Sequence, residues 1–347
     1  MPIGPTLILD KSTLQSLQVE EARWLGHHFH LNLIEPLYVE IAGASTTPDR
    51  ANPIGVLVSL ARKLLEMVPT IAPNMRHREL ILGNLLGLDF ELDGRIILDD
   101  VQTIRLPDGR TIHFQDEPPH FEALRRWARG ELNEREKKGA NSLRDFIASV
   151  DLNRIKEVMV SVPALNLRTL EEALELVDRV AASMGRFQAL KHMIGDLHVP
   201  ADLRDQVIKR WKAMGGPSVS EFAPYPYFIW QVDRLLDIGI GSSLISTKES
   251  KTYIDTMYLY YLPFCEVFVS SDKFHRQTVP LFLRSNQRFF WGPDIKADAA
   301  KLRVYYETLP EETRRTGSMT YARLPPKEGS FLVSEIFDEL RPGWREC

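Results

Sequence analysis

Four acidic residues stand at positions where their side chains could share a ligand. Asp10 directly follows the apolar run Leu7-Ile8-Leu9, and Asp272 follows Val267-Phe268-Val269 after two serines. Short, continuously apolar runs are typical of parallel strands that are covered on both faces. The carboxyl ends of such strands meet at one edge of a sheet, which is where ligands bind in open α/β sheets. We therefore expect Asp10 and Asp272 to lie side by side.

Two more acids are predicted on helices next to these strands. Glu40 lies in the stretch Leu37–Ile41, which follows Pro36 at helical spacing, and Asp255 lies in the helical stretch Tyr253–Tyr261. Four carboxylates in one place repel each other unless cations neutralise them. Hard cations such as Mg²⁺ and Mn²⁺ take all-oxygen ligands. A pair of them roughly 4 Å apart activates a water and stabilises the leaving oxygen in phosphodiester hydrolysis.

Each acid also has a structural interpretation, which the sequence leaves open. Asp10 and Asp255 could cap the helices that they precede or open, and Glu40 could be a solvated helix acid. Asp272 could be a turn residue before Lys273. The four acids could therefore hold metal or serve only the local backbone.

The arrangement of these acids resembles the acid signature of PIN-domain nucleases. Asp10 matches the first-strand acid, Glu40 the helical glutamate, Asp255 the third acid and Asp272 the acid after the fourth strand. Two serines also match: Ser12 falls where a small polar residue usually follows the first acid, and Ser270 where a hydroxyl residue precedes the last acid. The resemblance implies a three-layer α/β/α core with a short parallel sheet. It further implies Mg²⁺ or Mn²⁺ held by the four acids, which would be the catalytic residues, and RNA as the substrate.

The resemblance covers only part of the chain. Residues 1–43 and 225–315 match the two parts of such a core, whereas typical members have a far shorter segment between the second and third acids. We expect 44–224 to be a mostly helical insertion outside the sheet, and 316–347 to be a C-terminal tail. Two turn tetrads around Asp93-Gly94 and Asp108-Gly109 predict a small β-meander near 90–114 within the insertion.

Composition limits the class of protein. The chain has 347 residues with 26% charged residues, ordinary values for a soluble globular protein of about two domains. A net charge of −4 does not indicate a protein that coats nucleic acid, although a local basic groove is compatible with it. Two cysteines exclude a disulfide framework and favour a cytoplasmic location. No apolar run is long enough for a membrane span.

The sequence therefore predicts a metal-dependent nuclease that uses a cation-activated water to cleave RNA, with DNA as the alternative substrate. Lys273, His275 and Arg276, which follow Asp272, are candidates for contacts to the substrate phosphate, as are Ser12 and Ser270. An alternative is a catalytically silent PIN-like scaffold that binds a protein partner through its insertion, and a third is a phosphatase using the same acids. If the nuclease prediction is right, no lysine or arginine should be paired into the centre of the acids. Asp272→Asn should then stabilise, or barely change, the metal-free protein.

Overall fold

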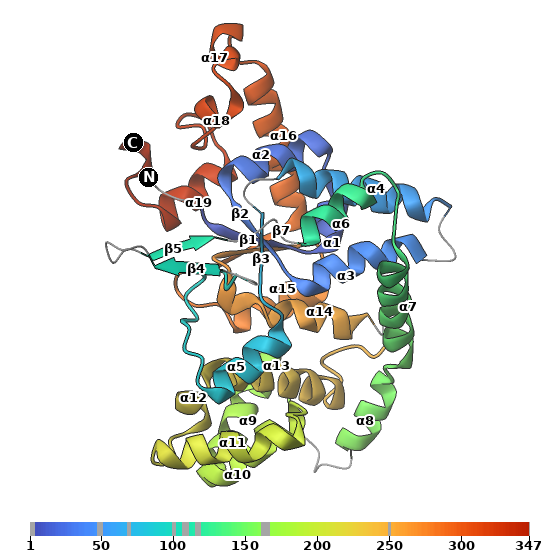
Figure 1. Cartoon of the computed structure of the whole chain (residues 1–347), viewed down its shortest axis with the longest axis vertical. Coiled ribbons are helices and arrows are strands. Elements are labelled where there is room, and N and C mark those ends of the chain that lie inside the picture. Colours follow the sequence, from blue (N-terminus) through green and yellow to red (C-terminus); the bar gives the residue numbers. More distant parts are fainter. Residues whose placement is uncertain are drawn as a thin grey trace.

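The computed structural model describes residues 4–46, 51–67, 71–98, 102–105, 111–114, 119–160, 167–248 and 251–346. At its centre lies a five-stranded sheet with the order β3-β2-β1-β6-β7, in which every neighbouring pair is parallel (Figure 1). Its strands are β1 (Thr6–Leu9), β2 (His30–Leu33), β3 (Ile71–Pro73), β6 (Val267–Ser270) and β7 (Arg288–Trp291). The α/β class expected from the sequence is confirmed.

The two strands that precede the aspartates are neighbours in this sheet. Leu7 of β1 lies opposite Val267 of β6, and Leu9 lies opposite Val269, although some 260 residues separate them. The side chains of these four residues are buried, because helices cover both faces of the sheet. The predicted parallel pairing of these strands is confirmed, and it places Asp10 and Asp272 at the same edge.

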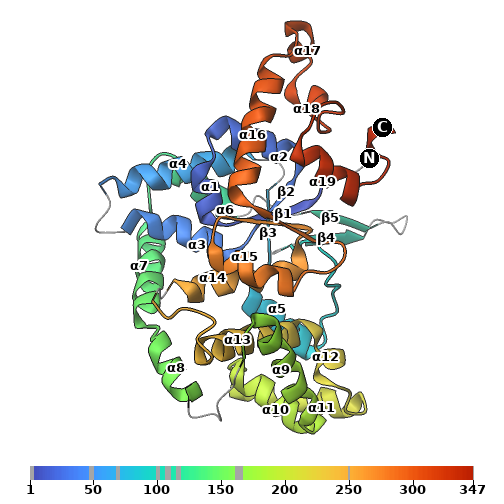
Figure 2. The same ribbon diagram turned by 180° about the vertical axis from the view of Figure 1, so that it is seen from behind.

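Helices surround the sheet and make up most of the chain. In the two opposite views, α2, α4 and α16 lie on one side of the sheet, and α13, α14 and α15 lie on the other (Figures 1 and 2). No helix among the described ranges is long and apolar enough to cross a membrane. In chain order, the helices of the described residues begin with α1 (Lys11–Ser16), α2 (Val19–His28), α3 (Glu35–Gly43), α4 (Pro53–Glu66), α5 (His77–Leu86), α6 (Pro119–Trp127), α7 (Glu134–Ser149), α8 (Leu152–Val160), α9 (Leu170–Ser183), α10 (Arg186–Asp196), α11 (Ala201–Ala213) and α12 (Val219–Phe222). They are followed by α13 (Pro224–Gly241), α14 (Thr252–Leu259), α15 (Lys273–Thr278), α16 (Gly292–Glu307), α17 (Glu311–Arg315), α18 (Ser318–Tyr321) and α19 (Leu332–Leu340).

The expected insertion needs a correction at its start. Residues 44–224 are mostly helical, but β3 within them forms the edge of the central sheet, paired with β2. The sequence conceals this strand, because it is three residues long and ends in Pro73. Proline lacks the amide proton needed between two neighbours, and an edge strand tolerates it. The chain therefore returns to the sheet once before the long helical stretch.

The expected meander is also corrected. In the described residues the small antiparallel sheet has two strands, β4 (Gln102–Arg105) and β5 (Thr111–Phe114). The turn at Asp108-Gly109 lies outside the described residues. The turn at Asp93-Gly94 instead packs against the central sheet, because Thr6 donates its hydroxyl proton to the Gly94 carbonyl oxygen at 2.7 Å.

A buried acid away from the sheet edge fixes the last long helix, α19. Both oxygens of Asp298, on α16, accept backbone protons at the start of α19, from Leu332 at 2.8 Å and from Val333 at 2.9 Å. Asp298→Ala would leave these two amides without their acceptor in a buried place. We expect a loss of about 3 kcal/mol in the free energy of unfolding. Urea unfolding measures it, with the exposed Asp294→Ala on the same helix as the control; equal losses in both variants would contradict the capping role.

Candidate functional site

Asp10 ends β1 at the carboxyl edge of the sheet and is almost completely buried, with 4% of its surface exposed. One carboxylate oxygen, Oδ1, accepts the backbone proton of Thr13 at 2.8 Å and so caps α1. The other, Oδ2, accepts the hydroxyl protons of Ser12 at 2.5 Å and Ser270 at 2.8 Å. The capping interpretation therefore holds for one oxygen, while the second ties β1 to β6.

Asp272 lies at the same edge and is partly buried. Its Oδ1 accepts the backbone proton of Phe274 at 2.8 Å, and its Oδ2 accepts a proton from Lys251 Nζ at 2.9 Å. Burial acts to raise the pKa of Asp272, but the bonds from Lys251 and Phe274 outweigh it and lower the pKa below its ordinary value. Asp272 thus carries its charge readily in the metal-free protein.

Glu40 reaches the same place from α3, the helix that follows β2. Tyr258 of α14 donates its hydroxyl proton to Glu40 Oε2 at 2.6 Å, and Lys11 Nζ lies 3.4 Å from Oε1. Tyr258 is buried, and its pKa is raised well above the ordinary value by that burial and by the charge of Glu40. The Glu40 side chain is therefore held toward Lys11 and α14 rather than pointing into solvent.

The charges of the three other acids all raise the pKa of Asp255, which lies on α14. Burial is the largest cause that raises its pKa to about 8, followed by the negative charge of Asp272; Glu40 and Asp10 add to this, and Lys251 opposes it. The three other charges therefore lie near enough to Asp255 to act on it, since charge interactions weaken with distance. At neutral pH in the metal-free protein, Asp255 therefore keeps a proton.

The sequence offered His275 only as a residue after Asp272 that could touch a phosphate, and the structure instead buries it within this site. It is completely buried, with Nδ1 2.8 Å from Ser270 Oγ and Nε2 2.7 Å from the backbone carbonyl oxygen of Asp255. Because a carbonyl oxygen only accepts, Nε2 must carry a proton. Burial lowers the pKa of His275, although the neighbouring acids and the Asp255 carbonyl oppose this. Its spacing of three residues after Asp272 was the only available signal.

The structure places the candidates for phosphate contacts in different surroundings. Ser12 and Ser270 both bond to Asp10, so they orient an acid. Arg276 is exposed and places its guanidinium over the ring of Trp291, 5.1 Å from the ring centre. Lys273 is exposed. In the part of the chain that the structure describes, the basic residues that do reach the acids are Lys11 and Lys251, which were not predicted.

Lys11 and Lys251 contradict one expectation from the sequence, and their ion pairs affect whether a metal ion can bind. The sequence predicted acids with no lysine paired among them, whereas Lys11 pairs with Glu40 and Lys251 with Asp272. Within the part of the chain that the structure describes, no three acids or histidines lie close enough together to hold a metal ion as they stand. The donor chemistry suits a hard cation, since the donors are carboxylate and hydroxyl oxygens. Binding one would require the lysines to give up their ion pairs.

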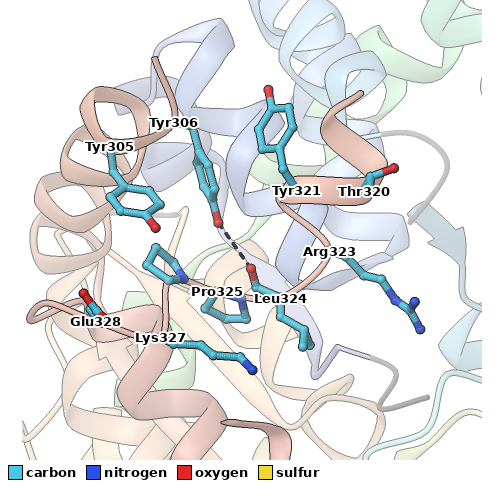
Figure 3. A pocket seen from close by; sticks show the side chains of 10 residues that line it. Tyr305, Tyr306, Thr320, Tyr321, Arg323, Leu324, Pro325, Lys327 and Glu328 are labelled. Atoms are coloured by element: carbon cyan, nitrogen blue, oxygen red, sulfur yellow. Dashed lines mark hydrogen bonds between the residues drawn. The ribbon is translucent and has the colours of Figure 1, made fainter. Parts of the chain in front are cut away.

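A cavity of about 710 Å³ lies elsewhere, between the end of α16 and residues 320–328 (Figure 3). Its lining includes Tyr305, Tyr306 and Tyr321, and Tyr306 donates its hydroxyl proton to the Leu324 carbonyl oxygen at 3.4 Å. Among the described residues, Glu328 is the one acid that lines it, and none of the four predicted site acids does. This cavity is therefore separate from the acidic sheet edge.

Comparisons with known proteins add no identification to this geometry. No family model matches the chain, and neither the characterised proteins nor the solved structures gave a match.

Proposed function

We propose that this chain is a metal-dependent nuclease that hydrolyses phosphodiester bonds in RNA, with a PIN-like core. The observation that supports this most is the convergence of four acids from separate elements on one sheet edge. Asp10 and Asp272 follow neighbouring parallel strands, and the charges of Asp10, Glu40 and Asp272 all raise the pKa of Asp255. RNA as substrate and a cytoplasmic location rest on the sequence: the resemblance to PIN-domain nucleases and the two cysteines.

Three groups of residues at this edge would have separate roles. Asp10, Glu40, Asp255 and Asp272 would hold Mg²⁺ or Mn²⁺, which would supply an activated water and neutralise the leaving oxygen. Ser12, Ser270 and Thr13 hold the Asp10 carboxylate in one orientation. Once a cation binds the carboxylates, the released ammonium groups of Lys11 and Lys251 would lie beside the scissile phosphate and attract it.

The experiment is a cleavage assay on end-labelled single-stranded RNA with Mn²⁺. We expect metal-dependent cleavage by the natural protein, and its loss in Asp272→Asn. The control is Glu175→Gln, which removes an exposed acid on α9 and should cleave normally. Absence of cleavage on single-stranded RNA, structured RNA and DNA would overturn the proposal.

The lysine pairs favour a second candidate function, a catalytically silent scaffold of the same fold that binds a protein partner through its helical segment. In such a protein Lys11 and Lys251 would permanently neutralise Glu40 and Asp272. Mn²⁺ would then leave the thermal stability unchanged, even at millimolar concentration. The two candidates are separated by whether the acids bind the ion at all.

If the lysines compete with a cation, removing one should tighten metal binding. Lys251 Nζ bonds to Asp272 Oδ2 at 2.9 Å, and its side chain is 56% exposed, so the pair is weak and can be exchanged. We expect Lys251→Met to bind Mn²⁺ about three- to tenfold more tightly in calorimetric titration. Lys273→Met, an exposed neighbour of Asp272, is the control with unchanged affinity. Weaker Mn²⁺ binding by Lys251→Met would show that the lysine does not compete.

A further inference from the structure

The cavity between the end of α16 and residues 320–328 has aromatic walls that keep exposed ring surface. Tyr305 and Tyr321 line it and are half-buried, and no hydrogen bond to either hydroxyl occurs among the described residues. Figure 3 shows the rings of Tyr305 and Tyr306 reaching from α16 toward the segment that holds Leu324 and Pro325. Such rings and unused hydroxyls suit a planar, aromatic ligand that also carries polar groups.

The fold holds the walls of this cavity in place. Tyr306 is buried and stacks on Trp24, with 4.4 Å between the ring centres. Its hydroxyl donates to the Leu324 carbonyl oxygen at 3.4 Å and so ties that segment to α16. Pro325, the next residue, is buried, and its ring fixes the local backbone. The cavity is therefore preformed, as sites for small molecules usually are.

The charged side chains that line the cavity favour an anion. Arg323 is exposed, and no carboxylate pairs with its guanidinium in the ranges that the structure describes. Lys327 adds a second positive charge, while Glu328 is the one acid among the described lining residues. A guanidinium presents several donors in one plane and can bind two oxygens of a phosphate at once. A cationic ligand would be repelled by the same lining.

The volume of the cavity, about 710 Å³, is in the range of sites for small molecules. We propose that it binds a nucleotide unit, whose base packs against the tyrosine rings and whose phosphate binds Arg323. The unit is either a free nucleotide or one residue of a single-stranded RNA, since both present the same base and phosphate. Of the described residues that line this cavity, none is an acid of the sheet edge, so this inference does not depend on the proposed function.

The test is calorimetric titration of the full chain with adenosine monophosphate, with uridine monophosphate and with a short single-stranded RNA. EDTA removes divalent cations, so that the RNA stays intact. Arg323→Gln removes the guanidinium, Tyr321→Leu removes one ring, and Tyr321→Phe keeps the ring without its hydroxyl. Arg179→Gln is the matched control, because Arg179 on α9 is also exposed and has no ion pair within the described ranges. Thermal melts establish that each variant is folded.

We expect saturable binding of at least one of these ligands by the natural protein. Arg323→Gln should weaken it about tenfold and Tyr321→Leu about fivefold, as expected for one charged hydrogen-bonding group and one stacked ring. Tyr321→Phe should regain most of the affinity, and Arg179→Gln should keep all of it. Binding of the free nucleotides assigns a nucleotide site, and binding of RNA alone assigns a site for a strand; both support the shared chemistry.

Absence of binding for both nucleotides and RNA overturns the proposal. Natural affinity in Arg323→Gln or Tyr321→Leu, or an equal loss in Arg179→Gln, overturns it too. A proline-rich peptide, which aromatic grooves also bind, is titrated alongside, and tighter binding of this peptide than of any nucleotide ligand overturns the proposal as well. Asp272→Asn, which tests the proposed function, should keep natural nucleotide affinity, so that either idea can fail without the other.

Discussion

Asp255→Asn is expected to stabilise the metal-free protein, and by about 3 kcal/mol more at pH 8 than at pH 5. Burial and the charges around Asp255 raise its pKa to about 8, from an ordinary value of 3.8. Between these two values the folded protein holds a proton that the unfolded chain has released. Folding stability therefore falls as the pH rises through this window, and asparagine, which does not ionise, removes that loss.

Urea unfolding at the two pH values measures the effect. Glu175→Gln, on the exposed face of α9, should show the same pH dependence as the natural protein. If the four acids bind Mn²⁺, the cation should stabilise the natural protein more at pH 8 than at pH 5, because it takes the place of the proton. A gain for Asp255→Asn that is equal at both pH values would contradict the shared field of the four acids.

The structure also changes which aspartate should relieve the repulsion among the acids when it is replaced. We expected relief of repulsion from Asp272→Asn, since clustered carboxylates repel each other. The structure lowers the pKa of Asp272 through Lys251 and the Phe274 amide, so the folded protein favours its charged form. The repulsion falls on Asp255 instead, and Asp272→Asn should lose a little stability rather than gain it.

The centre of the fold could be predicted because its signals are local. The runs Leu7–Leu9 and Val267–Val269 are continuously apolar, which happens where both faces of a strand are covered, and each run is followed by an acid. Parallel strands of this kind place their carboxyl ends together. The neighbourhood of Asp10 and Asp272 therefore followed from sequence, without any knowledge of the segment between them.

The other parts of the site depend on distant contacts, which leave no local pattern. His275 lies between Phe274 and Arg276, a sequence that suits an exposed turn as well as a buried ring. Lys251 is separated from Asp272 by a helix and a strand, and only the folded chain brings their charges together. Strand β3 forms because it pairs with β2, since three residues ending in proline have a low propensity to form a strand by themselves.

Two substitutions of Asp10 should separate its role in stability from a role in metal binding. Asp10→Ala would leave the Thr13 amide and the Ser12 and Ser270 hydroxyls without their acceptor at a nearly fully buried position. We expect a loss of about 3 kcal/mol in the free energy of unfolding. Asp10→Asn keeps an oxygen for the Thr13 amide, and its NH₂ group can donate to both serine hydroxyls, which also accept. Its loss should stay near 1 kcal/mol.

The two variants should nevertheless behave alike toward Mn²⁺, because each removes the negative charge at the end of β1. We expect Mn²⁺ to raise the melting temperature of the natural protein and to leave that of Asp10→Asn unchanged, as measured by thermal melts in the presence and absence of the ion. An unchanged Mn²⁺ response in Asp10→Asn would mean that this aspartate only caps α1 and ties β1 to β6. A well-folded Asp10→Asn without the response would mean that the same carboxylate also serves a cation, because the hydrogen bonds that hold the fold would still be in place.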